Sequence, residues 1–313
     1  TIGDVDGDGK LDMVASNYGT GTISVFRNTS TPGTIGSSSF APAVQFTAGG
    51  FPLYISVRDF DLDGKSDIAV LNTGSNNVSV FRNIGSPGTI NASSLSPKVD
   101  FAIGAFGQGL SVEDLDMDGK PDILVTVGNG VEILRNNTNR GAITGTSFDA
   151  KVNFATGSFP NYAATGDLDK DGKPDIVVSN WSNANISVLK NISSPGSIST
   201  GSFAAKFDIA TFSEPRGVAV GDLDGDGALE IAVAGQIANK VSVFKNVATA
   251  GALDLTSFAT NVDFPSSGNP RTLTMGDLDG DGRPELVMAG SSANAVGVLR
   301  NTVSTLAAPT LTS

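Results

Sequence analysis

The sequence predicts an all-β protein, a β-propeller built of four-stranded antiparallel blades. Three observations predict this class. One acidic motif recurs six times at nearly equal spacing. Each recurrence is accompanied by the same series of short runs of Val, Ile, Leu and Phe, four in each complete repeat, separated by Gly- and Asn-rich turns. No long amphipathic helical pattern occurs in the 313 residues.

The recurring motif is Asp-x-Asp-x-Asp-Gly-x-x-Asp/Glu. Its copies are separated by 55, 55, 53, 55 and 55 residues, and they start at Asp4, Asp59, Asp114, Asp167, Asp222 and Asp277. A fixed period of this length indicates one structural unit repeated along the chain. We therefore expect residues 1–313 to form a single repeat-built domain.

Four strands are expected in each repeat. In the second repeat, the first strand precedes the motif (residues 53–57) and the second follows it (68–70). The third alternates and ends in Phe81-Arg82-Asn83, and an 11-residue Pro/Gly/Ser/Thr-rich segment leads to the fourth. A linear β-solenoid is the alternative, but its turns are usually much shorter than 55 residues. A four-stranded meander with tight turns favours radial blades.

The sequence leaves open how the blades close into a ring. The strand before Asp4 is cut to residues 1–3, and the sixth repeat offers only the weak segment Leu306 to Thr312 as its fourth strand. Propellers often close by borrowing a strand from the opposite terminus. We expect the chain to be a processed or truncated piece whose parent has six or seven blades, and its oligomeric state is open.

Composition excludes several classes of function. The chain has no cysteine and no histidine, which rules out disulfides, thiolate metal sites, imidazole general-base chemistry and most zinc sites. No apolar stretch of about 18 residues occurs, so no membrane-spanning segment is expected. The net charge of −12 disfavours nucleic acid as a partner.

The motif has the chemistry of a calcium loop. In Asp167-Leu-Asp169-Lys-Asp171-Gly172, the acids at positions 1, 3 and 5 alternate, so that their carboxylates can converge. Position 6 is Gly in all six copies, as a turn with positive φ requires. Position 7 would offer its backbone carbonyl, and position 9 closes the loop with Asp or Glu. Hard oxygen ligands in this order suit Ca²⁺, whereas Mg²⁺ resists dehydration and Zn²⁺ prefers nitrogen or sulfur.

The distribution of charge supports a bound cation. The six loops hold 24 of the 32 Asp and Glu residues, and six divalent ions would add +12 to a chain of charge −12. Four carboxylates in one loop repel each other without a cation. The alternative, a solvated Asp-Gly turn, suits one isolated motif better than six copies in phase with the strands. A purely structural role for the ions is compatible with this interpretation.

The loop, its period and the flanking strands resemble the FG-GAP/VCBS repeat family, which includes the integrin α-subunit propeller and many bacterial surface proteins. The resemblance covers essentially the whole chain. It implies about six Ca²⁺ ions, one in each loop between the first and second strands, held by four acids and the position-7 carbonyl. The implied ligands are Asp4, Asp6, Asp8, Lys10 and Asp12; Asp59, Asp61, Asp63, Lys65 and Asp67; Asp114, Asp116, Asp118, Lys120 and Asp122; Asp167, Asp169, Asp171, Lys173 and Asp175; Asp222, Asp224, Asp226, Ala228 and Glu230; and Asp277, Asp279, Asp281, Arg283 and Glu285. Glu230 and Glu285 depart from the Asp found elsewhere at position 9.

In this family, ligands often bind the face opposite the calcium loops. Two aromatic residues fall in the variable loops expected there, Tyr18 and Trp181. Exposed aromatics suit sugar stacking or a protein contact, and the alternative is that each packs over a neighbouring blade edge. Six basic residues end the third strands, and they are expected to be solvated strand ends that also offset the field of the acidic loops: Arg27, Arg82, Arg135, Lys190, Lys245 and Arg300.

These observations predict a secreted or cell-surface module for adhesion or ligand binding, with an extracellular protein or glycan as partner. Catalysis is not expected, because the few acids outside the loops form no recognisable pair: these are chiefly Glu113, Glu132, Asp149 and Glu214. Two alternatives stay open. One is a polysaccharide lyase or hydrolase on a calcium-stabilised propeller, and the other is a structural spacer in a larger surface protein.

Overall fold

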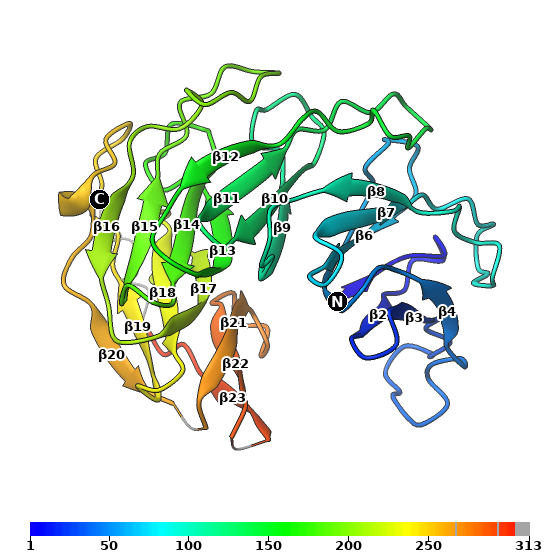
Figure 1. The fold of residues 1–313 in the computed structure, drawn as a ribbon. Coiled ribbons are helices and arrows are strands. Elements are labelled where there is room, and N and C mark those ends of the chain that lie inside the picture. The colour runs from blue at the N-terminus through cyan, green and yellow to red at the C-terminus, as the bar shows by residue number, and fades with distance from the viewer. Residues whose placement is uncertain (267, 293, 304–313) are drawn as a thin grey trace, which may run out of the picture. The chain divides into compact units, whose positions relative to one another are not determined.

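The computed structural model describes residues 1–266, 268–292 and 294–303. Apart from the short 3-10 turn η1 (Leu255–Ser257), the regular elements are all β-strands. They form six antiparallel sheets in which each strand pairs with its neighbour in sequence (Figure 1). Five sheets have four strands, and the sixth has three within the described ranges. The fold is the predicted β-propeller, with one blade for each sequence repeat.

The first three blades contain strands β1 to β12. Their bounds are β1 (Ile2–Gly3), β2 (Asp12–Asn17), β3 (Thr22–Phe26), β4 (Val44–Thr47), β5 (Pro52–Arg58), β6 (Asp67–Asn72), β7 (Asn77–Phe81), β8 (Val99–Ala102), β9 (Gly109–Glu113), β10 (Asp122–Val127), β11 (Gly130–Leu134) and β12 (Val152–Ala155).

The last three blades contain strands β13 to β23. Their bounds are β13 (Pro160–Gly166), β14 (Asp175–Asn180), β15 (Asn185–Leu189), β16 (Phe207–Ala210), β17 (Pro215–Gly221), β18 (Glu230–Gly235), β19 (Lys240–Phe244), β20 (Val262–Pro265), β21 (Pro270–Gly276), β22 (Glu285–Gly290) and β23 (Ala295–Leu299). The predicted fourth strand of the sixth repeat, Leu306 to Thr312, lies outside the described residues.

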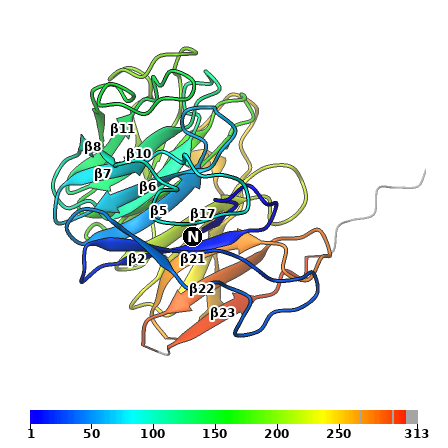
Figure 2. The same ribbon diagram turned by 90° about the vertical axis from the view of Figure 1, so that its right-hand side faces the viewer.

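The chain divides into two compact units. The first comprises Thr1–Ala155 with Ser193–Ser202, and the second comprises Thr156–Ile192 and the described residues from Phe203 on. Inside the first unit β5 packs against β9, and inside the second β17 packs against β13. The strand β17 also packs against β21 (Figure 2). Within each unit, the first strands of consecutive blades therefore lie side by side. The prediction of a single domain over residues 1–313 stays a prediction.

Burial explains why the second strands are almost continuously apolar. All six residues of β6, β10, β14 and β18 are buried. A strand covered on both faces by neighbouring sheets needs apolar side chains on both faces. Polar residues in these strands are hydrogen-bonded: Asn72, for example, donates to Ser79 Oγ at 2.8 Å.

The apolar residue at position 2 packs between its own blade and the next in the loops that start at Asp4, Asp59 and Asp167. Phe60 is fully buried and meets Phe148 of the following repeat edge-on, with ring centroids 5.9 Å apart. Val5, Leu115 and Leu168 are equally buried. Leu278, at the same position in the sixth loop, is instead 61% exposed. No following repeat covers that residue within the described part of the chain.

Candidate metal-binding loops and the aromatic loops opposite them

Each acidic loop joins the first strand of a blade to the second, as predicted. The turn needs left-handed backbone at two positions. Position 6 is Gly in every copy, with φ of +93° at Gly64, and position 4 is also left-handed, with φ of +56° at Leu62. The left-handed residues at positions 4 and 6 curl the loop so that alternate side chains point inward.

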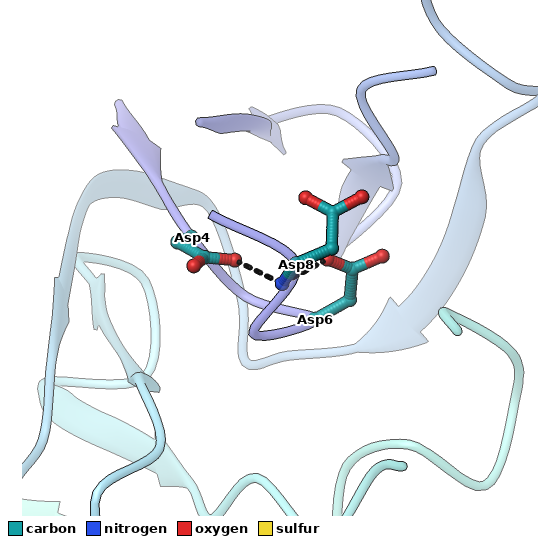
Figure 3. Close-up of side chains that lie close together, drawn as sticks. All are labelled: Asp4, Asp6 and Asp8. Atoms are coloured by element: carbon teal, nitrogen blue, oxygen red, sulfur yellow. Dashed lines mark hydrogen bonds between the residues drawn. The ribbon is translucent and has the colours of Figure 1, made fainter. Parts of the chain in front are cut away.

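The backbone of the loop is held by its own carboxylates. In the first loop, the N–H of Asp8 donates to Asp4 Oδ1 and to Asp6 Oδ1, each at 3.2 Å (Figure 3). The N–H of Gly9 donates to Asp4 Oδ2 at 2.9 Å, and that of Lys10 to Asp8 Oδ1 at 3.0 Å. The same bonds recur in the loop that starts at Asp59. Acids at positions 1, 3 and 5 therefore shape the loop as well as charge it.

The acid at position 9 is buried in every loop. Asp67 is fully buried, and its two oxygens accept the N–H groups of Phe60 at 3.0 Å and Asn83 at 2.7 Å. It thus ties the start of the loop to the end of the third strand. Burial raises the pKa of Asp67, Asp122 and Asp175 to about 7, because the backbone donors only partly offset the loss of water.

Carboxylate oxygens from three acids converge in each of the first five loops, within 4.8 Å of one another. The groups are Asp4, Asp6 and Asp8; Asp59, Asp61 and Asp67; Asp114, Asp116 and Asp122; Asp167, Asp169 and Asp175; and Asp222, Asp224 and Glu230. Positions 1, 3 and 9 thus meet in four of these five groups, and position 5 takes the place of position 9 in the group of the first loop. Ligation by the position-7 carbonyls stays a prediction.

One carboxylate oxygen indicates that the loops suit a cation. Asp116 is fully buried, and its Oδ1 is buried without a hydrogen-bond partner. Leaving a buried acceptor unpaired costs free energy. Asp116 belongs to an oxygen-only group with Asp114 and Asp122. The residues present therefore fit a hard divalent ion such as Ca²⁺.

The six basic residues at the ends of the third strands lie against the acidic loops. In the first blade, Arg27 donates from Nε to Asp6 Oδ2 at 2.5 Å and lies 3.4 Å from Asp8 Oδ2. Lys190 pairs with Asp169 in the same way. The expectation that these residues are solvated strand ends is wrong for Arg135, whose side chain is only 16% exposed. The expectation that the six basic residues offset the negative charge of the acidic loops is confirmed.

The two predicted aromatic residues lie at the other end of the strands, in loops opposite the acidic ones. Tyr18 stacks on Phe51 with ring centroids 4.9 Å apart, and both rings stay about half exposed. Trp181 is half-buried and meets Phe159 edge-on at 6.5 Å. Its Nε1 is buried without a hydrogen-bond partner. Tyr18 thus packs on a neighbouring repeat and still presents a surface.

Three functional candidates were missed at the sequence level. Phe51, Phe106 and Phe159 occupy the same place before the first strand in three successive repeats, and each is at least 51% exposed. All three have positive φ, between 52° and 62°. A bulky residue with positive φ is strained. The repeated Gly-rich stretch around an isolated Phe was the available signal, but its backbone conformation depends on the folded loop.

Comparison with protein families identifies the repeat. A family model described as an FG-GAP-like repeat matches residues 4–70, 59–125, 114–178 and 222–288. The chain belongs to the FG-GAP repeat family. Its matched segments run from one acidic loop through the next, so this FG-GAP chain repeats the family unit in register with its blades. No curated protein sequence matches the chain significantly.

Solved structures share the fold. A lectin from Agrocybe aegerita that recognises non-reducing terminal N-acetylglucosamine is 21% identical, with 97% of this chain and 80% of the lectin covered and a TM-score of 0.61. BBS1N, solved in complex with ARL6DN, is 14% identical, with 96% and 77% covered and a TM-score of 0.61. A putative 6-phosphogluconolactonase from Bacteroides uniformis is 15% identical, with 95% and 79% covered and a TM-score of 0.57.

These identities are low, so the three structures show a common fold and nothing about function. No helix among the described residues is long and apolar enough to cross a membrane.

Proposed function

We propose that this FG-GAP chain is a calcium-stabilised, ligand-binding propeller that works outside the cell or at its surface. The observation that carries the proposal is the acidic loop itself. The same inward-facing acids recur in every blade, and three of them converge in each of the first five loops. A fold alone would not need 24 acids in six loops.

Calcium is the ion proposed for these loops. The donors are carboxylate oxygens, with a backbone carbonyl expected at position 7, and a flexible set of six to eight oxygens is what Ca²⁺ takes. When bound, the ion supplies a positive charge that links the two strands flanking the loop. Positions 1, 3, 5 and 9 would hold it, and Asp116 Oδ1 would gain the partner that it lacks. Sites of this kind on extracellular modules fill at about 0.1 to 1 mM calcium, which supports a location outside the cell.

The aromatic loops are the proposed ligand surface. The stacked pair Tyr18 and Phe51 presents two half-exposed rings, and Phe106 is 65% exposed. The left-handed backbone recurs at Glu214 and Asn269 in the next two repeats and so belongs to the blade turn, but the exposed aromatic rings in three successive repeats are best accounted for by a binding role. A glycan or a protein is the proposed ligand. Two structures that share the fold support this choice, because the lectin recognises non-reducing terminal N-acetylglucosamine and BBS1N was solved in complex with ARL6DN.

A non-catalytic role is part of the proposal. Two of the acids outside the loops are engaged in ion pairs. Glu132 is buried and pairs with Lys151 at 2.9 Å, and Asp149 pairs with Arg135 at 3.2 Å. Neither is a free carboxylate held ready for acid–base chemistry.

The test has two arms. Titration of calcium into chelator-stripped protein should show about six bound ions and a rise in the unfolding temperature. A glycan and protein array in 1 mM calcium should then show a ligand that Phe51→Ala weakens at least tenfold, with the exposed Ile35→Ala as a matched control. No calcium binding would overturn the first arm. A ligand that binds Phe51→Ala, Phe106→Ala and the native chain equally would overturn the second.

A further inference from the structure

Each acidic loop is paired with one basic side chain from the end of the third strand of its own blade. In the second blade, Arg82 donates from Nε to Asp61 Oδ2 at 2.5 Å and from Nη2 to Asp63 Oδ2 at 2.7 Å. The other oxygens of these two acids accept loop N–H groups, from Asp63 at 3.2 Å and Lys65 at 3.0 Å. The carboxylates at positions 3 and 5 are therefore fixed from both sides, by the backbone and by the guanidinium.

The arrangement is common to all six blades. The basic side chain reaches the acids at positions 3 and 5 of its own loop in each case: Arg27 with Asp6 and Asp8, Arg82 with Asp61 and Asp63, Arg135 with Asp116 and Asp118, Lys190 with Asp169 and Asp171, Lys245 with Asp224 and Asp226, and Arg300 with Asp279 and Asp281. In each blade the basic residue lies 17 to 21 residues after the acid that it contacts. Six repetitions of this contact indicate that the pairing is a regular feature of the repeat.

The following repeat covers this pairing. The N–H of Gly141, in the segment between β11 and β12, donates to the carbonyl of Asp61 at 2.9 Å. A Cβ atom at Gly141 would lie 3.5 Å from Arg82 Nη2. Gly88 donates in the same way to Asp6, and Gly196 to Asp116. The cover partly removes water from the ion pair, which strengthens it compared with an exposed pair.

We propose that this basic side chain is a built-in counter-ion, which lets the acidic loop fold before it binds a metal ion and lowers the affinity of the loop for that ion. The second half of the proposal rests on the calcium binding proposed above. Four acids in one loop repel each other, and a fixed guanidinium offsets this repulsion in the metal-free protein. Once a divalent ion enters, the same guanidinium is a like charge that shares two of its carboxylates.

The sign of the effect follows from the charges. Removing the guanidinium should loosen the metal-free loop and strengthen metal binding. For a +1 and a +2 charge several ångströms apart at the surface, the gain in affinity is on the order of tenfold. A side chain that only positioned the carboxylates would behave in the opposite way, since its loss would weaken metal binding.

Arg82→Gln in the full chain tests the proposal. Hydrogen exchange of the segment 59–67, followed by mass spectrometry across a calcium titration, reports this one loop among six. In chelator, the variant should exchange at least tenfold faster there than the native chain, because the amides of Asp63, Gly64 and Lys65 depend on the fixed carboxylates. With calcium, the midpoint of protection should move to about tenfold lower concentration. The segment 114–122 serves as the internal reference.

Two further variants make the outcome decisive. Lys206→Gln removes one positive charge from an exposed ion pair with Asp208, an acid that belongs to no acidic loop, and should leave the segment 59–67 unchanged. Arg82→Lys keeps the charge, as Lys190 does naturally, and should keep the native midpoint even if Arg82→Gln folds poorly. The counter-ion proposal would be overturned if the calcium midpoint of Arg82→Gln stayed in place or rose, or if the segment 59–67 of this variant exchanged at the native rate in chelator. If calcium does not change hydrogen exchange in the acidic loops of the native chain, the calcium proposal is overturned instead. The comparison of exchange rates in chelator would still test whether the basic side chain stabilises the metal-free loop.

Discussion

At the scale of the residue, the backbone of the acidic loop decides which side chains are tolerated. Gly64 has φ of +93°, and no atom lies within 4 Å of the place where a Cβ would be added. Space is therefore free, and only the conformation requires glycine. Position 4 shares the left-handed backbone, yet three repeats place Leu62, Met117 and Lys170 there.

Gly64→Ala should destabilise the protein through conformation alone. The expected loss in the free energy of unfolding is about 1–2 kcal/mol, the cost of placing an L-residue in the left-handed region. Leu62→Gly is the matched control, because Leu62 is 39% exposed and Gly is native at this position in other repeats. That control should be neutral or slightly stabilising. Chemical unfolding of both variants checks the prediction, and equal stability of Gly64→Ala and the native chain would contradict it.

At the scale of the element, the end of the third strand joins one repeat to the one before it. Asn136 is fully buried, and its Nδ2 donates to Pro121 O of its own loop at 3.0 Å and to Phe60 O of the preceding repeat at 2.9 Å. Asn83, Asn246 and Asn301 repeat the second bond. These amides connect blades at the level of the acidic loops, next to the apolar residue at position 2.

Asn136→Ala should lower the free energy of unfolding by about 2–4 kcal/mol, because it removes the two buried hydrogen bonds that Nδ2 donates and the one that Oδ1 accepts from the N–H of Thr138, although the carbonyl of Phe60 keeps the Thr138 hydroxyl as a donor. Asn28→Ala is the matched control. Asn28 donates to Leu11 O at 3.0 Å, but among the described residues it has no bond to another repeat. Its loss should cost about 1 kcal/mol. Thermal and denaturant unfolding measure both variants, and similar losses would show that the bond between repeats carries little stability.

At the scale of the whole molecule, the buried acids make stability depend on pH and on calcium together. Asp67, Asp122 and Asp175 have a pKa of about 7 in the folded chain, above the ordinary value of 3.8, because of burial. Burial also raises the pKa of Asp12 and Glu230. Asp254 is exposed, and the hydrogen bonds from Thr256 lower its pKa. A lowered pKa in the folded chain would make stability rise with pH, but solvent screens this contribution because Asp254 is exposed.

The calcium-free protein should therefore lose stability as the pH rises from about 4 to about 7. In that range the unfolded chain has released protons that the folded chain still holds, so the free energy of unfolding falls; below it both states are protonated and above it both are ionised. Saturating calcium should abolish or reverse the slope, since the ion requires the ionised form. Unfolding curves at pH 4.5, 5.5, 6.5 and 7.5 with chelator and with calcium give the answer. A chelated protein that gains stability toward neutral pH would refute the prediction.

Local patterns in the sequence determined much of this protein. Six copies of the acidic motif, with Gly at position 6, located the loops, and alternating apolar runs located the strands, because both depend on neighbours in the chain. Tertiary structure alone decided three other features. Arg82 meets Asp61 21 residues away, Asn136 meets Phe60 76 residues away, and Phe51 is exposed on strained backbone. Each of these depends on how separate strands and blades pack, and spacing along the chain does not encode that packing.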